Sequence, residues 1–163
     1  MRARLEEHLG SRQVARVVYG SIVGLALVVA LEHHPPAPRG IVASLVGTGV
    51  AVGLAEVYSE VVGVEASTRR RIDRHQLRHF AADSGAMFVG AAFPALFFVL
   101  AGLGVLEVET AFSLAKWSGL GLIGFYGYWA ARFAGAPPER ALVRALLVAL
   151  VGAALILLKS LLH

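Results

Sequence analysis

The chain has 163 residues, of which 57% are hydrophobic and only 16% are charged, and its mean hydropathy is +0.69. A typical soluble domain is about 45–50% apolar and about 25% charged, and a soluble core of this size could not bury so much apolar surface. The composition therefore argues against a soluble domain and against a disordered chain. It predicts an all-α, polytopic membrane protein.

Five mostly apolar stretches are long enough to cross a bilayer as helices, which takes about 20 residues. We expect one domain over 1–163, with spans near 14–32, 40–64, 85–106, 110–132 and 139–161 and a basic cytoplasmic loop at 65–84. Prolines end the first span, and Pro137 and Pro138 separate the last two. Pro94 predicts a kink inside the third span.

The distribution of basic residues sets the expected orientation. Twelve of the 15 basic residues fall on one side of this layout: Arg2, Arg4, Arg12, Arg16, Arg69, Arg70, Arg71, Arg74, Arg78, Arg132, Arg140 and Arg144. The other side holds Arg39, Lys116 and Lys159. Because cytoplasmic loops are rich in Lys and Arg, we expect a multi-pass protein of the inner (plasma) membrane, with the N-terminus inside and the C-terminus outside.

The basic loop is the only sizeable soluble segment, and we expect it to be helical, as an extension of the second span. Its arginines are Arg69, Arg70, Arg71, Arg74 and Arg78. Each would gain about 1 kcal/mol near anionic lipid headgroups, so membrane lipid is the expected partner. A regulatory or partner-binding role is the alternative.

Glycines recur at the spacing that lets helices pack closely in lipid. They are Gly20 and Gly24 in the first span, Gly49 and Gly53 in the second, and Gly121, Gly124 and Gly127 in the fourth. These faces could pack within the subunit, in a homodimer or against another membrane protein. Lining a permeation path is the remaining alternative.

The second span carries the main candidate site. Glu56 and Glu60 lie one helical turn apart, on the same face as Gly49 and Gly53. Ionisable groups inside a span are functional candidates by default. The two carboxylates could bind a metal cation or hold a proton. Alternatively, Glu60 reaches cytoplasmic water, or Glu56 pairs with an arginine or with the Tyr19 hydroxyl.

Neutral polar side chains could complete a transport path around the two glutamates. Ser59 is adjacent on the second span, while Tyr19 and Ser21 on the first span would lie at a similar depth if the two spans pack antiparallel. Structural hydrogen bonding is the alternative for both residues of the first span.

Three other polar features have simpler interpretations. Lys116 should extend towards the membrane surface or pair with Glu107 or Glu109. Asp83 and Ser84 are interpreted as an N-cap of the third span. No catalytic, phosphate-binding or nucleic-acid-reading motif is present, so we expect no enzymatic activity, no cofactor and no nucleic-acid partner.

Several stretches resemble the vacuolar iron transporter family. The residues from Val18 to Leu25 are similar to its glycine-rich first span, those from Gly53 to Glu60 to its acidic second span, and those from Gly90 to Pro94 to its proline-bearing third span. The resemblance implies a five-span fold and metal transport with Glu56 and Glu60 as ligands.

The chain departs from this family at three places. Its only methionines are Met1 and Met87, whereas family members place methionine near the second-span carboxylates. The first span offers Ser21 where iron-exporting members carry an acidic residue, and residues 65–84 are rich in arginine where many members have an acidic metal-binding region. Two hypotheses therefore stand: a cation transporter that moves a divalent metal or protons, and a non-transporting accessory or scaffold subunit. An internal partner for Glu56 would favour the second.

Overall fold

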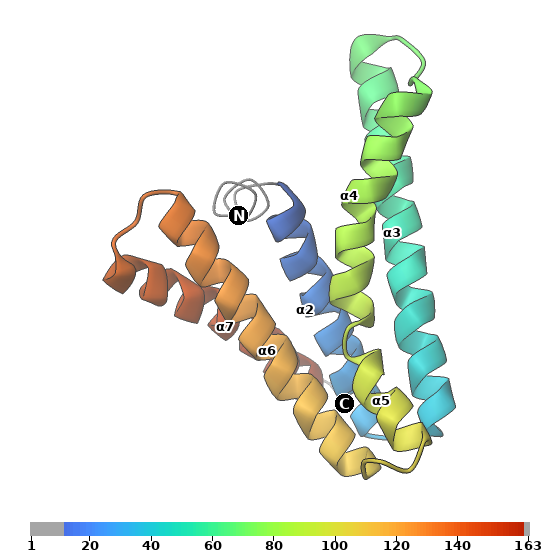
Figure 1. Cartoon of the computed structure of the whole chain (residues 1–163), viewed down its shortest axis with the longest axis vertical. Helices are drawn as coiled ribbons and strands as arrows, with labels where there is room; N and C mark the ends of the chain where they lie inside the picture. Colours follow the sequence, from blue (N-terminus) through green and yellow to red (C-terminus); the bar gives the residue numbers. More distant parts are fainter. Residues whose placement is uncertain (1–11, 162–163) are drawn as a thin grey trace.

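The computed structural model describes residues 12–161, and all elements in that range are helices, with no strand (Figure 1). They are α2 (Arg12–Glu32), α3 (Pro38–Thr68), α4 (Arg74–Ala92), α5 (Ala95–Gly102), α6 (Val108–Phe133) and α7 (Pro138–Leu161). The all-α prediction is confirmed for this part of the chain. Arg2 and Arg4, assigned above to the cytoplasmic side, lie outside the described residues.

The breaks between helices follow the prolines and, before α6, a short turn that carries Glu107. α2 ends just before the proline-containing turn, and Pro38 begins α3. Gly104 and Gly135, in the turns before α6 and α7, have positive φ angles of 76° and 82°. Glycine adopts this conformation without the steric penalty that other residues incur. The local sequence therefore favours ending α5 before Gly104 and α6 before Gly135.

The third expected span is two helices rather than one. α4 and α5 meet at Phe93 and Pro94 with a bend of 51°, which confirms the kink. α4 begins at Arg74, where the Asp73 backbone N–H donates to Oε1 of Gln76 at 3.2 Å. The N-cap is therefore Asp73 rather than the Asp83–Ser84 pair. The segment 65–84 is mostly helical, but only residues 65–68 extend the second span as expected. Residues 69–73 form a turn, and residues 74–84 belong to α4.

Two helices are long and apolar enough to cross a membrane: α2 over Val14–Glu32, and α3. The bent pair α4 and α5 makes a third if it counts as one span. By length and composition, the described residues thus contain two or three candidate spans rather than the five expected. α6 is not among the candidate spans because polar and aromatic residues alternate with its apolar residues and lower its hydropathy.

α2 is the central helix, with contacts to α3, α4, α6 and α7. The apolar core lies at the end of the bundle where α2 finishes and α3 begins, and it includes Val28, Ile41, Leu45, Phe98 and Phe112. The rings of Phe98 and Phe112 meet edge to face, with centroids 4.8 Å apart. This core joins four helices at one end of the molecule.

α2 and α4 pack with their backbones in close contact. A Cβ atom on Gly24 would lie 2.5 Å from the carbonyl oxygen of Ala91, and Cβ atoms on Gly20 and Gly90 would clash with the carbonyl oxygens of Met87 and Val17. Residue numbers rise together along this contact, so the two helices run parallel. Gly20 and Gly24, two of the glycines predicted to serve helix packing, do so here within one chain.

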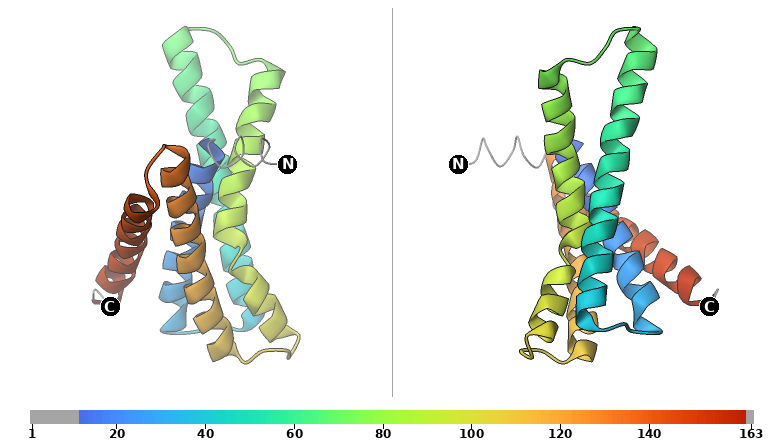
Figure 2. Two further views of the ribbon diagram at one scale, coloured as in Figure 1. Left: turned by 60° about the vertical axis from the view of Figure 1, so that its left-hand side comes forward. Right: turned by 90° about the vertical axis from the view of Figure 1, so that its right-hand side faces the viewer.

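The α3–α4 hairpin extends beyond the other helices (Figures 1 and 2). α3 has 31 residues, which corresponds to about 46 Å, whereas the hydrocarbon core of a bilayer is about 30 Å thick. In a membrane, the last turns of α3 and the first turns of α4 would therefore stand outside the hydrocarbon region.

Candidate functional site

Arg16, in the second turn of α2, is surrounded by carboxylates from two other helices. Its Nη1 lies 2.6 Å from Oδ2 of Asp83, its Nε lies 3.6 Å from Oε1 of Glu56, and its Nη2 donates to Oε1 of Glu60. The arginine side chain is only 9% exposed. We call these four residues the Arg16 cluster.

Local helix geometry brings the cluster together. Arg16 lies one turn before Gly20 on α2, and Asp83 lies one turn before Met87 on α4. Because Gly20 holds α2 against the backbone at Met87, the two charged residues one turn away lie opposite each other. Glu56 and Glu60 extend from adjacent turns of α3 and approach the same guanidinium.

The cluster contains more acid than base. Three carboxylates, those of Glu56, Glu60 and Asp83, surround the one guanidinium of Arg16. A buried arginine requires such partners, since an unpaired buried charge is strongly destabilising. Acidic groups therefore outnumber the basic group within these four residues, which makes the cluster a candidate for attracting a cation.

A second ion pair lies at the opposite end of α2. Nζ of Lys116 lies 2.6 and 2.8 Å from the two carboxylate oxygens of Glu32. The expectation that Lys116 pairs with Glu107 or Glu109 is therefore wrong, because packing of α6 on α2 brings a more distant carboxylate closer. Arg16 and Glu32 are about 24 Å apart along α2. In a bilayer, the Arg16 cluster would lie near one surface rather than at the centre.

The structure brings together only part of the predicted transport path. Glu56 and Glu60 share the cluster, but no hydrogen bond among the described residues joins Tyr19 or Ser59 to it. Tyr19 is 54% exposed, and Ser59 is also exposed. Ser21 is buried and donates instead to the Val17 carbonyl oxygen at 2.8 Å. Its hydroxyl is thus satisfied within its own helix.

Sequence reasoning missed two members of the cluster, Arg16 and Asp83, which it had assigned to membrane orientation and to a helix cap. A signal was present, because Arg16 continues the face of Gly20 and Gly24 by one turn. A charged residue that extends a small-residue packing face must lie against the neighbouring helix. The sequence alone did not show which helix that would be.

The cluster is not a ready-made metal site. Among residues 12–161, no group of three or more His, Cys, Asp or Glu side chains is placed so that it could hold a metal ion. The guanidinium of Arg16 occupies the position between the carboxylates that a cation would need. A metal would have to displace it, whereas a proton could bind one carboxylate without doing so.

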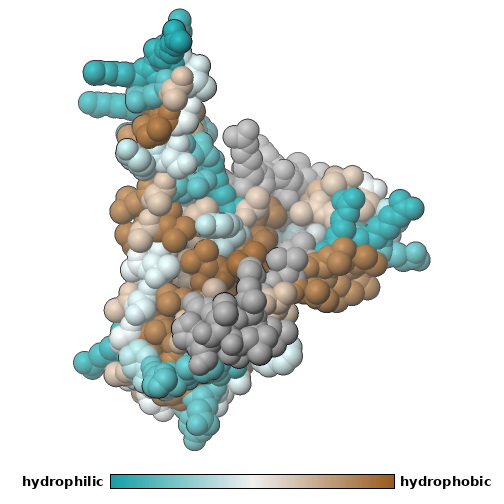
Figure 3. Space-filling view, turned by 180° about the vertical axis from the view of Figure 1, so that it is seen from behind, coloured by the Kyte–Doolittle hydropathy of each residue, from teal (hydrophilic) through white to brown (hydrophobic). Residues whose placement is uncertain are grey.

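The hairpin tip gathers the arginines of the basic loop. Hydrophilic side chains cover this end of the molecule at the upper left of Figure 3. A hollow of about 540 Å³ there is lined by Val64, Thr68, Arg70, Arg71 and Gln76. Arg69 ends α3 in the left-handed conformation, with φ 54°. The tip is therefore a compact positive surface outside the apolar part of the bundle.

Comparison with known proteins adds no assignment: no family model, no curated protein and no solved structure matches the chain.

Proposed function

We propose that the chain is a five-span transporter of the inner (plasma) membrane that moves a cation, and that the Arg16 cluster binds and releases protons at the cytoplasmic end of the path. The observation that carries this proposal is the gathering of three carboxylates from two helices around one buried arginine. The resemblance of three stretches to the vacuolar iron transporter family supports the same class of function.

The five-span arrangement is supported by helix length and surface chemistry. α6 and α7 have 26 and 24 residues, enough to cross about 30 Å of hydrocarbon. Within α7, residues 141–158 contain one charged side chain, Arg144. Exposed side chains recur every four residues along α3 at Val46, Val50, Leu54, Tyr58 and Val62. An apolar stripe of this kind suits contact with lipid.

Orientation gives a direct test of this arrangement. A reporter fused after His163 should be active only outside the cytoplasm, and a cysteine introduced at the hairpin tip, Arg70→Cys, should be labelled only from the cytoplasmic side. Positive-inside distribution is the physical reason. A cytoplasmic C-terminal reporter would contradict an odd number of spans.

Within the cluster, Glu56 is the best candidate for the exchanging group. It has the longest contact to Arg16, at 3.6 Å, and the most exposed carboxylate, at 31%. Asp83 and Glu60 hold the guanidinium more closely. Glu56 could therefore leave Arg16 and take up a proton or a cation while the arginine stays paired.

Transport should fail when the carboxylates of Glu56 and Glu60 are removed. In proteoliposomes, the flux of ferrous iron, manganese or protons should be lower by a factor of about 10 or more in the Glu56→Gln, Glu60→Gln double variant than in the wild type. The reason is that a charged contact contributes about 1.5–3 kcal/mol. The variant should still fold, because Asp83 remains paired with Arg16. Ion flux with a pH-sensitive or metal-sensitive dye is the measurement.

The matched control is Glu107→Gln, Glu109→Gln, which makes the same change in net charge in the turn and first residues of α6. Its flux should equal that of the wild type. Wild-type flux in both double variants would show that the Arg16 cluster is not part of the transport path.

A second candidate function is that of an accessory or scaffold subunit. Two observations favour it: Glu56 and Glu60 are paired inside the chain, and a Cβ on Gly121 or Gly124 of α6 would meet nothing within 4 Å. That open glycine face could receive a second copy or another membrane protein. A wild-type protein that folds and inserts correctly but moves none of the three ions would favour this role.

The basic hairpin tip fits a role at the cytoplasmic membrane surface in either case. We assign Arg69, Arg70, Arg71, Arg74 and Arg78 to contacts with anionic lipid headgroups. Their exposure and the projection of the hairpin support this assignment.

A further inference from the structure

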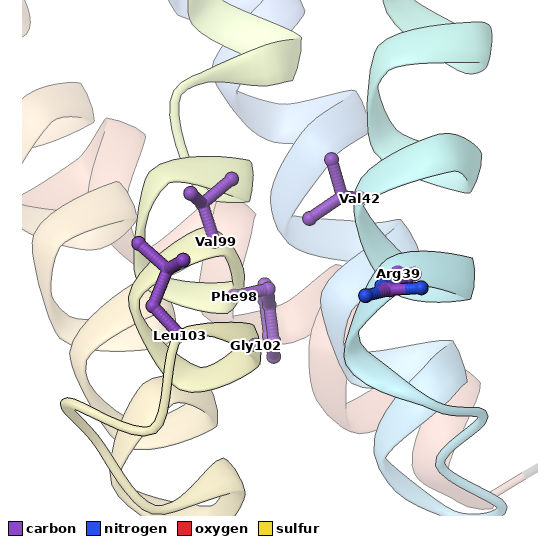
Figure 4. A pocket seen from close by; sticks show the side chains of 6 residues that line it. All are labelled: Arg39, Val42, Phe98, Val99, Gly102 and Leu103. Carbon is purple, nitrogen blue, oxygen red and sulfur yellow. The ribbon is translucent and has the colours of Figure 1, made fainter.

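A hollow of about 270 Å³ lies between α3 and α5, at the end of the bundle opposite the Arg16 cluster (Figure 4). Its lining consists of Arg39 and Val42 from α3 and of Phe98, Val99, Gly102 and Leu103 from α5 and its C-terminal end. The volume lies near the lower end of the range for small-molecule sites, roughly 300–1,000 Å³.

The walls of this hollow are apolar apart from one positive charge. Phe98 is fully buried at its base, while Val99 and Leu103 are 42% and 72% exposed at its sides. Gly102 contributes no side chain, and a Cβ there would point to Pro38, 3.7 Å away. Such a surface accepts a hydrocarbon chain, and the missing side chain at Gly102 leaves room for it.

Arg39 at the edge of the hollow has no acidic partner. No carboxylate among the described residues lies within ion-pair distance of it, and the first turn of α3 contains no acidic residue. A cation in the first turn also faces the positive end of the helix dipole. An anion beside Arg39 would therefore balance a charge that has no acidic partner and would also interact favourably with the positive end of the helix dipole.

We propose that this hollow binds an anionic phospholipid from the surrounding bilayer, with its phosphate at Arg39 and part of one acyl chain against Phe98, Val99 and Leu103. The charge complementarity and the apolar lining together require an amphiphile that is anionic at one end. The site lies at the level of the Glu32–Lys116 pair and so at the membrane surface remote from the Arg16 cluster. It is independent of any ion transport.

Lipid adducts measured by native mass spectrometry test this site. The purified protein in detergent is titrated with phosphatidylglycerol, and separately with phosphatidylethanolamine carrying the same acyl chains. We expect one tightly held phosphatidylglycerol and a weaker phosphatidylethanolamine adduct. Arg39→Gln should lower the affinity for this tightly held phosphatidylglycerol about tenfold, as expected for the loss of one charged contact. The tightest site should then no longer prefer phosphatidylglycerol, whereas weaker binding at the arginines of the hairpin tip should stay unchanged.

Two variants at Gly102 separate the effect of the hollow's volume from that of its charge, and a third variant, at Arg140, is the control. Gly102→Leu fills the space and should reduce binding of both lipids, whereas Gly102→Ala makes only an ordinary contact and should bind phosphatidylglycerol as the wild type does. Arg140→Gln, at an exposed arginine on α7, should also bind normally. Melting temperatures of all variants confirm that they fold.

Three results would overturn the proposal. One is an unchanged phosphatidylglycerol preference in Arg39→Gln, and another is wild-type binding in Gly102→Leu. The third is tight binding of a free fatty acid without binding of phosphatidylglycerol, which would assign the hollow to a different anionic amphiphile. None of these outcomes depends on measured ion flux, so the lipid site and the transport function can fail separately.

Discussion

Replacing Arg16 by methionine is expected to lower the free energy of unfolding by about 3–5 kcal/mol, because it leaves Glu56, Glu60 and Asp83 without their shared partner. Methionine keeps most of the volume of the side chain, so the effect reports charge rather than a cavity. Denaturant titration in detergent micelles measures it.

Adding Glu60→Gln and Asp83→Asn to the Arg16→Met variant should recover most of this loss, because the remaining polar groups are then neutral apart from Glu56. The control is Arg140→Met on the exposed surface of α7, which should change stability by no more than about 0.5 kcal/mol. Similar losses at positions 16 and 140 would show that the cluster does not stabilise the fold.

Gly24→Ala is expected to destabilise the chain by about 1–3 kcal/mol, although alanine is the better helix former. The added Cβ would lie 2.5 Å from the carbonyl oxygen of Ala91, so α2 and α4 must move apart and lose their close packing. Helix propensity favours the same substitution by only about 0.8–1 kcal/mol. The steric cost therefore exceeds the gain in helix propensity, and the net change in the free energy of unfolding is a loss. Thermal unfolding in detergent measures this loss.

Gly121→Ala makes the same chemical change where the structure offers open space, since nothing lies within 4 Å of the added Cβ. Only helix propensity then applies, and stability should stay equal or rise by up to about 1 kcal/mol. A loss at position 121 comparable with that at position 24 would mean that the α6 glycine face is packed in the folded protein.

The helices were largely predictable because their ends coincide with strong local signals. Prolines and glycines mark the ends of α2 and α6 and the break before α5. The start of α4 was missed because residues 74–84 lie outside the apolar stretch and carry no hydropathy signal. The local signal there was the Asp73–Gln76 spacing of a capping box.

The candidate site was only half predictable, because its geometry depends on the register between helices that are not adjacent in the chain. The spacing of Glu56 and Glu60 on one face follows from helix periodicity. Their pairing with Arg16 depends on the register of α2 relative to α4, and the close contacts at Gly20 and Gly24 determine that register. Lys116 illustrates the same point, since its partner Glu32 lies 84 positions away.

The parallel packing of α2 on α4 has a consequence for biosynthesis. Arg16 is made first, but Asp83 follows 67 positions later in the sequence. At about 5–20 residues per second, this delay is on the order of 3–13 s. Glu56 and Glu60 of α3 are made 40 and 44 positions after Arg16 and can pair with it earlier. Arg16 therefore acquires its partners in two steps, first from α3 and then from α4, and the cluster is complete only when both helices of the hairpin have been made.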